Sequence, residues 1–349
     1  METFETLIRT EFAPKNTYLD TATAGLLPAR TVTAMRVAVE SAAAGQPTDM
    51  YADVEAARAS FARLVGVPER RVAAGASVAV YSGLIAASLP PGAEVLTAEA
   101  DFSSVGTPFH VRGDLKVRAV PLERIAESVR SGTALVAVSA VQSADGRAAE
   151  LEAIGEAARE HGARTYIDAS QAAGWLPLRA DAYDYVSSVA FKWLVCPRGV
   201  AFLVVPEDLG GLTPVFAGWV AGEAPWDSCY GPVEELAHSA RRFDESPSLF
   251  AYAGARHSLE LVETLGVERV HAHDLALADR FRAGLRERGH EPVPAPGSAI
   301  VSVPGLGRFQ GELSRAGVQV ADRAGNLRAA FHLYNTPDDV DRLLDVLPG

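Results

Sequence analysis

The chain has 349 residues, 48% hydrophobic and 22% charged, a balance that excludes a disordered, collagen-like or coiled-coil protein. Lysine and arginine number 32 against 44 aspartates and glutamates, and the resulting net charge of −12 argues against nucleic-acid binding. The two cysteines cannot build a disulfide framework, the first residues lack an apolar signal segment, and no apolar run approaches about eighteen residues. We therefore expect a cytoplasmic protein that binds neither nucleic acid nor membrane.

Helix and strand patterns alternate through the first two thirds of the chain. Continuously apolar strand runs are typical of a parallel sheet covered on both faces, and the alternation predicts a doubly wound α/β domain. A ligand of such a domain lies at the carboxyl ends of the strands. Helices are expected over 31–44, 53–65, 78–88 and 150–161, the last capped by Gly162, and strands over 94–97, 135–139, 164–168, 185–189 and 200–205.

The pattern changes after residue 206, where a stretch rich in proline, glycine and tryptophan runs to residue 232. We expect a large α/β domain over residues 1–245, whose N-terminal segment contributes to the site or to the small domain. The smaller C-terminal α+β domain covers residues 246–349. Its predicted elements are helices over 248–265, 270–288 and 337–347 and a strand over 299–303.

An acid and a lysine follow two successive apolar strands of the predicted sheet. Asp168 closes one strand, and Lys192, one of three lysines in the chain, follows the next. Parallel neighbours would bring both side chains to one edge of the sheet, where they could form a structural ion pair. The same pair also suits pyridoxal phosphate, because lysine forms an imine with the cofactor aldehyde and an aspartate holds the pyridine nitrogen protonated.

At these residues the sequence resembles the class V aminotransferases and cysteine desulfurase-like enzymes of the fold-type-I pyridoxal phosphate superfamily. The resemblance extends from Tyr18-Leu-Asp-Thr-Ala-Thr-Ala-Gly25 to Tyr334-Asn335-Thr336. It implies a fold-type-I transferase with pyridoxal 5′-phosphate as cofactor and Lys192 as the Schiff-base lysine. It also implies that Asp168 pairs with the pyridine nitrogen and that Gln171 reaches the phenolic oxygen.

Further cofactor contacts follow from the same resemblance. Ala76 and Ser77 resemble a turn whose hydroxyl and amides hold the cofactor phosphate at a helix N-terminus, although serine there could be an ordinary helix cap. Phe102 takes the place of the residue that stacks on the pyridine ring, or it is a core phenylalanine. Either Gln142 or Ser143, at the end of the preceding strand, reaches the cofactor hydroxyl.

An arginine near the C-terminus precedes the Tyr-Asn-Thr turn, as in the family. Arg328 is therefore expected to bind the α-carboxylate of the substrate through a bidentate pair, the alternative being a solvated surface charge. No metal is expected, because His271 and His273 stand two apart in a helical stretch and do not share a face.

The sequence departs from the family just before the lysine. Many relatives carry serine and histidine there as phosphate ligands, whereas this chain has Val189 and Phe191. The candidates to replace them are Ser188 or Ser187, or else Arg241, Arg242 and Ser246, which a partner subunit could contribute.

The resemblance leaves several reactions open. No cysteine lies in residues 304–327, where desulfurases place their nucleophile, and we expect neither Cys196 nor Cys229 to accept sulfur. The leading interpretation is an aminotransferase acting at the α-carbon of a small amino acid. A C–S lyase or other β-elimination enzyme comes next, then an epimerase. A non-catalytic binding module is the alternative from another class, and it predicts loss of Lys192 or Asp168, both of which are present.

We also expect a homodimer with a shared active site. The resemblance implies it, and the aromatic stretch 219–230 is too apolar to remain exposed in a monomer. The other expected partner is the small amino-acid substrate.

Overall fold

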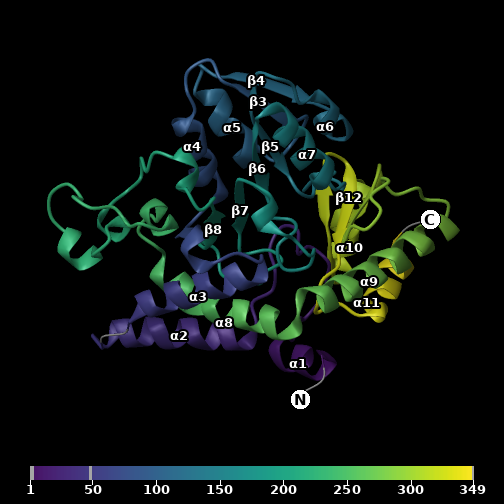
Figure 1. The fold of residues 1–349 in the computed structure, drawn as a ribbon. Coiled ribbons are helices and arrows are strands. Elements are labelled where there is room, and N and C mark those ends of the chain that lie inside the picture. Colours follow the sequence, from purple (N-terminus) through teal and green to yellow (C-terminus); the bar gives the residue numbers. More distant parts are fainter. Residues whose placement is uncertain (1–3, 47–48, 348–349) are drawn as a thin grey trace.

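The computed structural model describes residues 4–46 and 49–347, and a seven-stranded sheet lies at its centre (Figure 1). The strand order is β2-β8-β7-β6-β5-β3-β4, and neighbouring strands are parallel except around β8, which is antiparallel to both β2 and β7. This confirms the mostly parallel α/β sheet. The strands are β2 (Val72–Gly75), β3 (Glu94–Ala98), β4 (Lys116–Val120), β5 (Thr133–Ser139), β6 (Arg164–Asp168), β7 (Tyr185–Val189) and β8 (Ala201–Val204).

All five predicted strands of this sheet are present, and sequence patterning missed two more. β2 has only four residues, and β4 is an edge strand whose Lys116 and Ala119 are exposed. An edge strand need not be apolar throughout, because one side of it faces solvent. The continuous apolar run that identified the central strands is therefore absent from β4.

Helices cover both faces of the sheet, and alternate strand residues supply the two cores. In β5, Leu135 and Ala137 belong to one buried cluster, while Val136 and Val138 belong to the other. Helices α4 and α5 pack on the first face; α3, α7 and α8 pack on the second. The helices around the sheet are α2 (Ala29–Ala43), α3 (Met50–Leu64), α4 (Val78–Ser88), α5 (Ser103–Val111), α6 (Ile125–Ser128), α7 (Leu151–His161) and α8 (Leu249–Leu265).

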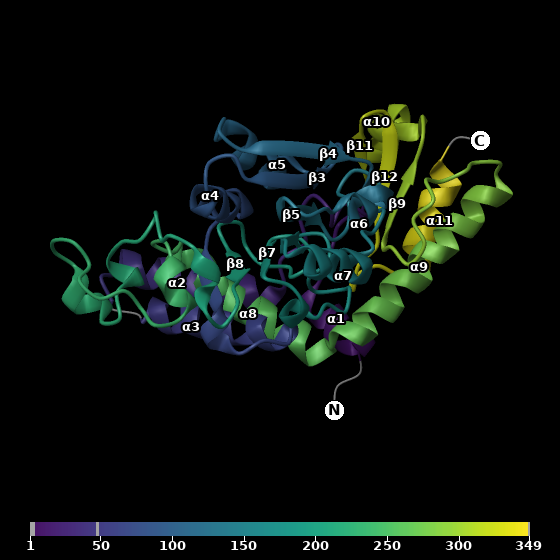
Figure 2. The same cartoon turned by 45° about the horizontal axis from the view of Figure 1, so that its top comes forward.

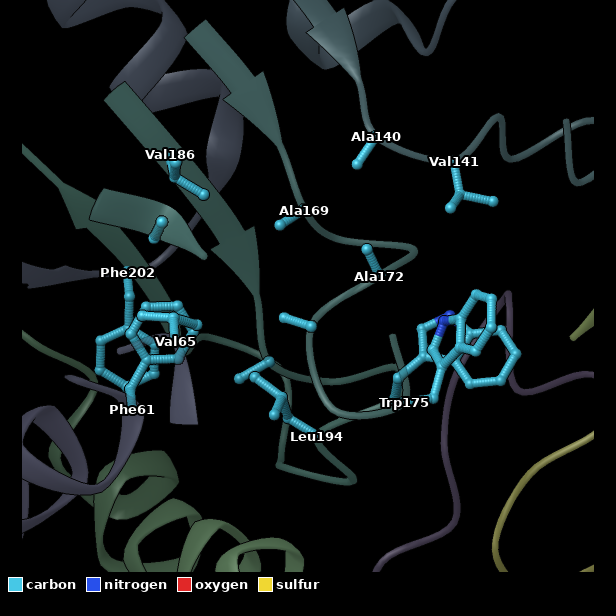
Figure 3. Packing of buried hydrophobic residues seen from close by; sticks show 14 of the residues in the cluster. Phe61, Val65, Ala140, Val141, Ala169, Ala172, Trp175, Val186, Leu194 and Phe202 are labelled. Atoms are coloured by element: carbon cyan, nitrogen blue, oxygen red, sulfur yellow. The ribbon is translucent and has the colours of Figure 1, made fainter. Parts of the chain in front are cut away.

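The second core is dense with aromatic rings. Phe61 of α3 stacks on Phe202 of β8, with ring centroids 4.4 Å apart (Figure 3). Trp175, fully buried, lies further along the same cluster. α7 ends at Gly162 with a φ of 69°, the left-handed cap that the sequence predicted. All the predicted helices are present within a few residues of their expected ends.

A smaller α+β unit stands beside the large sheet (Figure 2). Its three-stranded antiparallel sheet has the order β11-β12-β9, and its own buried cluster includes Leu19 from the N-terminal segment. Its elements are α9 (Val267–Glu287), β9 (Ile300–Val303), α10 (Gln310–Arg315), β10 (Val318–Gln319), β11 (Ala321–Arg323), β12 (Asn326–Ala330) and α11 (Pro337–Val346), together with β1 (Thr17–Tyr18), which pairs with β10; α1 (Phe4–Glu11) begins the described chain.

Along α9 the buried residues pass from the cluster of the large sheet, at Val270, to the cluster of the small unit, at Leu277, while Ala299, Ile300 and Tyr334 beyond α9 again belong to the first cluster. α8 shares its core with the large sheet. The predicted domain boundary near residue 245 stays a prediction. No helix in the described ranges is long and apolar enough to cross a membrane.

Candidate active site

A cavity of about 380 Å³ opens where β6 and β7 end, the edge at which a ligand of this architecture is expected. Its wall comes from the N-terminal loop, from loops that follow strands of the large sheet, and from β11 of the small unit. The lining residues are Ala22, Thr23, Ser77, Val78, Phe102, Ser104, Ser143, Asp168, Ser170, Val189, Phe191, Lys192, Arg198 and Arg323.

Lys192 stands in this wall on a tightly packed loop. Its carbonyl accepts a hydrogen bond from Val195, whose φ of 49° is a left-handed conformation rare for a β-branched residue. A Cβ added to Gly25 would come within 2.1 Å of the same carbonyl oxygen. Burial lowers the pKa of Lys192 from 10.5 to about 8, so a larger share of the amine is neutral than in an exposed lysine.

Asp168 ends β6 and is buried beside Ser170. Its carboxylate accepts hydrogen bonds from the Ser170 amide at 2.9 Å and from the Ser170 hydroxyl at 2.6 Å. Burial raises its pKa, while these hydrogen bonds and the charge of Lys192 act the other way. In the described part of the chain Asp168 forms no direct ion pair with Lys192, so the purely structural ion pair is not what the fold has built.

Phe102 borders the cavity next to the lysine. Its ring is 45% exposed, and the Lys192 Nζ lies 5.1 Å from its centroid. A core phenylalanine would be buried, so the structure excludes that alternative. Asp101, which sequence reasoning missed, ties this loop to β5 by accepting hydrogen bonds from the Ser139 amide at 2.9 Å and hydroxyl at 2.6 Å.

The N-terminus of α4 opens into the cavity through Ser77 and Val78. The Ser77 hydroxyl also caps the helix, accepting from the Val80 amide at 3.4 Å. Ala76 does not line the cavity, and its amide donates to the Glu245 carboxylate at 2.7 Å. The first-turn N–H groups of such a helix favour an anion.

At the ends of β6 and β7 the structure places Ser170 at the cavity, and not Ser188, which the sequence suggests. Ser188 is fully buried, donates to the Val189 carbonyl at 3.0 Å, and does not line the cavity. Ser170, which sequence reasoning missed, does line it, and its hydroxyl accepts from the Val189 amide at 3.0 Å. Its place two residues after Asp168 was the available signal.

Of the two residues proposed for the cofactor hydroxyl, Ser143 lines the cavity and Gln142 does not. Gln142 is buried, and its side-chain amide nitrogen has no hydrogen-bond partner among the described residues. Gln171 donates to the Ser143 hydroxyl and to the Ala22 carbonyl, both at 2.9 Å, and accepts from the Trp193 indole at 2.8 Å. It therefore braces the wall behind Ser143.

Arg328 is only 1% exposed and is not a lining residue. This excludes a solvated surface charge. Its guanidinium pairs with Asp20 at 3.0 Å, and it donates to the Thr23 hydroxyl at 2.7 Å and to the Ser143 carbonyl at 2.5 Å. Burial lowers its pKa.

Two other arginines line the cavity. Arg198 follows Lys192 closely in the sequence, and that proximity was a usable signal. Arg323 carries no local motif, and it reaches the cavity only because β11 packs beside the N-terminal loop.

A buried pair behind the lysine loop also escaped sequence reasoning. His332 contacts the Trp193 carbonyl through Nε2 and Asp274 through Nδ1, both at 2.9 Å, and the side chains of His332 and Asp274 are fully buried. A carbonyl can only accept, so Nε2 carries a proton. The pair fixes the residue that follows Lys192.

The donor set fits pyridoxal 5′-phosphate. The cavity offers one amine for an aldehyde, a buried carboxylate for a pyridine nitrogen and an exposed aromatic ring beside them. It also offers a helix N-terminus for a phosphate.

Comparison with known proteins agrees with this geometry. Residues 17–304 match the family Aminotransferase class-V. An uncharacterized aminotransferase, YcbU, from Bacillus subtilis is 27% identical over 83% of this chain and 82% of its own. The isopenicillin N epimerase of Amycolatopsis lactamdurans is 28% identical over 96% and 95%, and a probable cysteine desulfurase of Streptomyces coelicolor is 26% identical over 65% and 59%.

Solved structures show the same fold. A cysteine desulfurase from Thermococcus onnurineus NA1 superimposes with a TM-score of 0.83 at 21% identity, covering 95% of this chain and 94% of its own. The cystine C-S lyase C-DES in complex with cysteine persulfide gives 0.87 at 21% identity, covering 95% and 97%. The family match and the site geometry lead to one conclusion: the chain is an enzyme of the class V aminotransferase family, with the fold-type-I architecture and pyridoxal 5′-phosphate as its cofactor.

Proposed function

We propose that this enzyme transfers the amino group of a small amino acid, with Lys192 as the catalytic base at the α-carbon. The observation that carries the proposal is the composition of the cavity wall. Among the described residues that line it, Lys192 is the single amine, and the other ionisable groups are Asp168, Arg198 and Arg323. An amino-group transfer needs one base that can move a proton from the α-carbon, and Lys192 supplies it.

Pyridoxal 5′-phosphate, when bound, supplies an aldehyde for the amino group and an electron-accepting ring. Lys192 would hold the aldehyde and, once released, take the α-proton on its Nζ; with a pKa of about 8, about a tenth of that amine is neutral at pH 7, far more than in an exposed lysine. Asp168 would keep the pyridine nitrogen protonated, and Phe102 would cover the ring. Ser77, at the α4 N-terminus, would receive the phosphate, and Ser143, braced from behind by Gln171, would face the phenolic oxygen.

Arg328 has a more indirect part in this proposal. Its α-carboxylate role rests on the resemblance, while its guanidinium already pairs with Asp20. We propose that it acts on the substrate carboxylate mainly through Thr23 and Ser143, the two lining residues to which it donates.

Persulfide chemistry is disfavoured by the position of both cysteines. Cys196 is buried, and burial raises the pKa of its thiol, which suppresses the thiolate. Cys229 is exposed in residues 206–238, a segment that projects from the body as an arm (Figures 1 and 2), and neither cysteine lines the cavity. A desulfurase needs a thiolate that reaches the substrate.

Epimerisation is disfavoured by the lack of a second base. Two-sided proton exchange needs an acid–base group on each face of the α-carbon. Among the described residues no histidine, tyrosine, glutamate or cysteine lines the cavity. β-Elimination needs only one base and stays the second candidate, because Lys192 could serve it as well.

The test is an assay of the purified holoenzyme with a panel of amino acids and 2-oxo acids. We expect keto acid from the donor, amino acid from the acceptor, ping-pong kinetics and neither sulfide nor free ammonia. Lys192→Ala should lower turnover by about 10⁴-fold, and Lys116→Ala, on an exposed edge strand, should not. Ammonia released without an acceptor would establish elimination instead.

We also propose a cytoplasmic homodimer whose active site includes residues from the partner. The 206–238 arm projects from the body (Figures 1 and 2), and Trp226 is 71% and Tyr230 96% exposed. Exposed aromatic side chains gathered on one arm favour a protein interface. Light scattering should give twice the 36.9 kDa chain mass, and Trp226→Ser with Tyr230→Ser should lower it.

A further inference from the structure

Two arginines in the cavity wall have no acidic partner. Arg198 and Arg323 form no ion pair in the described part of the chain, although the net charge of the protein is −12. Arg198 lies over the Phe191 ring, with its guanidinium carbon 4.1 Å from the centroid. Arg323 donates to the Thr23 hydroxyl at 2.7 Å and to the Asp322 carbonyl at 2.9 Å. Unpaired guanidinium groups in a cavity favour an anionic ligand.

The N-terminal loop brings these arginines to one side of the cavity. The Gly25 amide donates to the Phe191 carbonyl at 2.8 Å, which joins this loop to the segment that carries Arg198. Thr23, in the same loop, accepts from both Arg323 and Arg328 at 2.7 Å. We call this side of the cavity, formed by Thr23, Arg198 and Arg323, the arginine wall.

The arginines in and behind the arginine wall differ in whether an acidic side chain pairs with them. Asp20 accepts from Arg328 at 3.0 Å and from the Thr23 hydroxyl at 2.7 Å, so its one carboxylate is taken by the buried guanidinium. Arg323 reaches Asp20 only through the Thr23 hydroxyl, and Arg198 does not reach it by any hydrogen bond. Two positive charges therefore remain at the cavity, one more than the α-carboxylate of a simple amino acid can balance.

We propose that the substrate is an amino acid with a carboxylate on its side chain, and that Arg198 and Arg323 receive its two carboxylates. This rests on the proposed function, since it assumes that the cavity around Lys192 takes an amino acid. In this proposal the phosphate of the cofactor is assigned to the α4 N-terminus at Ser77, so that both arginines are available to the substrate. Arg328 is then a positioning residue that orients Thr23.

The experiment measures binding and needs no turnover. Glutarate and butyrate are titrated calorimetrically into the holoenzyme; both are unreactive, and they differ by one carboxylate. We expect glutarate to bind at least about tenfold more tightly, the ratio for one charge-assisted contact. Arg198→Gln and Arg323→Gln should each bring the ratio close to one. Equal binding of the two acids by the wild type would overturn the proposal without any variant.

Arg308→Gln is the matched control. Arg308 is exposed and lies over Phe309, with its guanidinium carbon 4.5 Å from the centroid, but it stands outside the cavity. It should leave the ratio unchanged. If Arg198→Gln weakens retention of the cofactor and spares the ratio, Arg198 serves the phosphate and the proposal fails. A preserved ratio in an enzyme that transfers no amino group would support this proposal and reject only the reaction.

Discussion

The two sides of the cavity differ in how the chain builds them. The sheet wall, with Asp168 and Lys192, consists of residues at or just after the ends of neighbouring strands β6 and β7. The arginine wall joins a loop near residue 23 to residues 198 and 323 through side-chain contacts and one backbone hydrogen bond. The sheet wall therefore depends on strand order, whereas the arginine wall depends on how the small unit and the N-terminal loop pack.

The largest effect is expected at the buried pair that holds the loop carrying Lys192. Asp274→Asn removes the buried charge beside His332, which holds the Trp193 carbonyl in the lysine loop. Breaking a buried pair of this kind costs about 3–5 kcal/mol of unfolding free energy. Urea denaturation measures it. Asp341→Asn, which loses a half-exposed pair with Arg280, should cost less than about 1 kcal/mol. If both variants lost the same unfolding free energy, the buried pair would not hold the lysine loop in place.

A second variant separates chemistry from packing on the sheet wall. Asp168→Asn should lower kcat by about 10²-fold, because its carboxylate is the one acidic group that the described lining residues offer to the pyridine nitrogen. Glutarate binding at the arginine wall should survive. Steady-state kinetics and calorimetry give the two readouts, and Asp181→Asn, an exposed acid paired with Arg179, serves as the control. An unchanged kcat with cofactor retained would remove Asp168 from the mechanism.

Gly25→Ala should strain the contact between the two walls. The new Cβ would meet the Lys192 carbonyl oxygen at 2.1 Å, so backbone must move, at a cost of about 1–3 kcal/mol. We expect weaker glutarate binding together with lower stability. Gly311→Ala, in α10 with open space around it, should be neutral or slightly stabilising. If both variants behave alike, the close approach of the loops is unimportant.

The smallest effect is a shift in titration. The neutral amine of Lys192 is the reactive form, so its modification by an amine reagent should rise with pH, with an inflection at about pH 8. Arg198→Gln or Arg323→Gln removes a repelling charge and should move the inflection to higher pH; Asp168→Asn should move it lower. Mass spectrometry of the cofactor-free protein measures the modified fraction of Lys192 at each pH, and the exposed Lys116 is the reference. Shifts of the inflection to higher or to lower pH can both be detected. Inflections that do not move would show that neither wall acts on the amine.

Sequence reasoning found the sheet wall because its signals are local. An apolar run indicates a buried strand, and a polar residue at its end indicates the ligand edge, so Asp168 and Lys192 were visible without tertiary structure. The same reasoning correctly predicted α7 and its Gly162 cap, because helix caps depend on residues within one turn. It missed β4, because an edge strand carries no continuous apolar run.

The sequence alone therefore determined the fold and placed Lys192 and Asp168 together at the ligand edge of the sheet, while packing decided which arginines line the cavity. Nothing near Arg323 distinguishes it from the other arginines; it lines the cavity because β11 lies against the N-terminal loop. Arg328 looked like the carboxylate receptor, yet the fold buries it against Asp20. Burial and charge pairing arise between residues some 300 positions apart, and local periodicity carries no information about contacts at that separation.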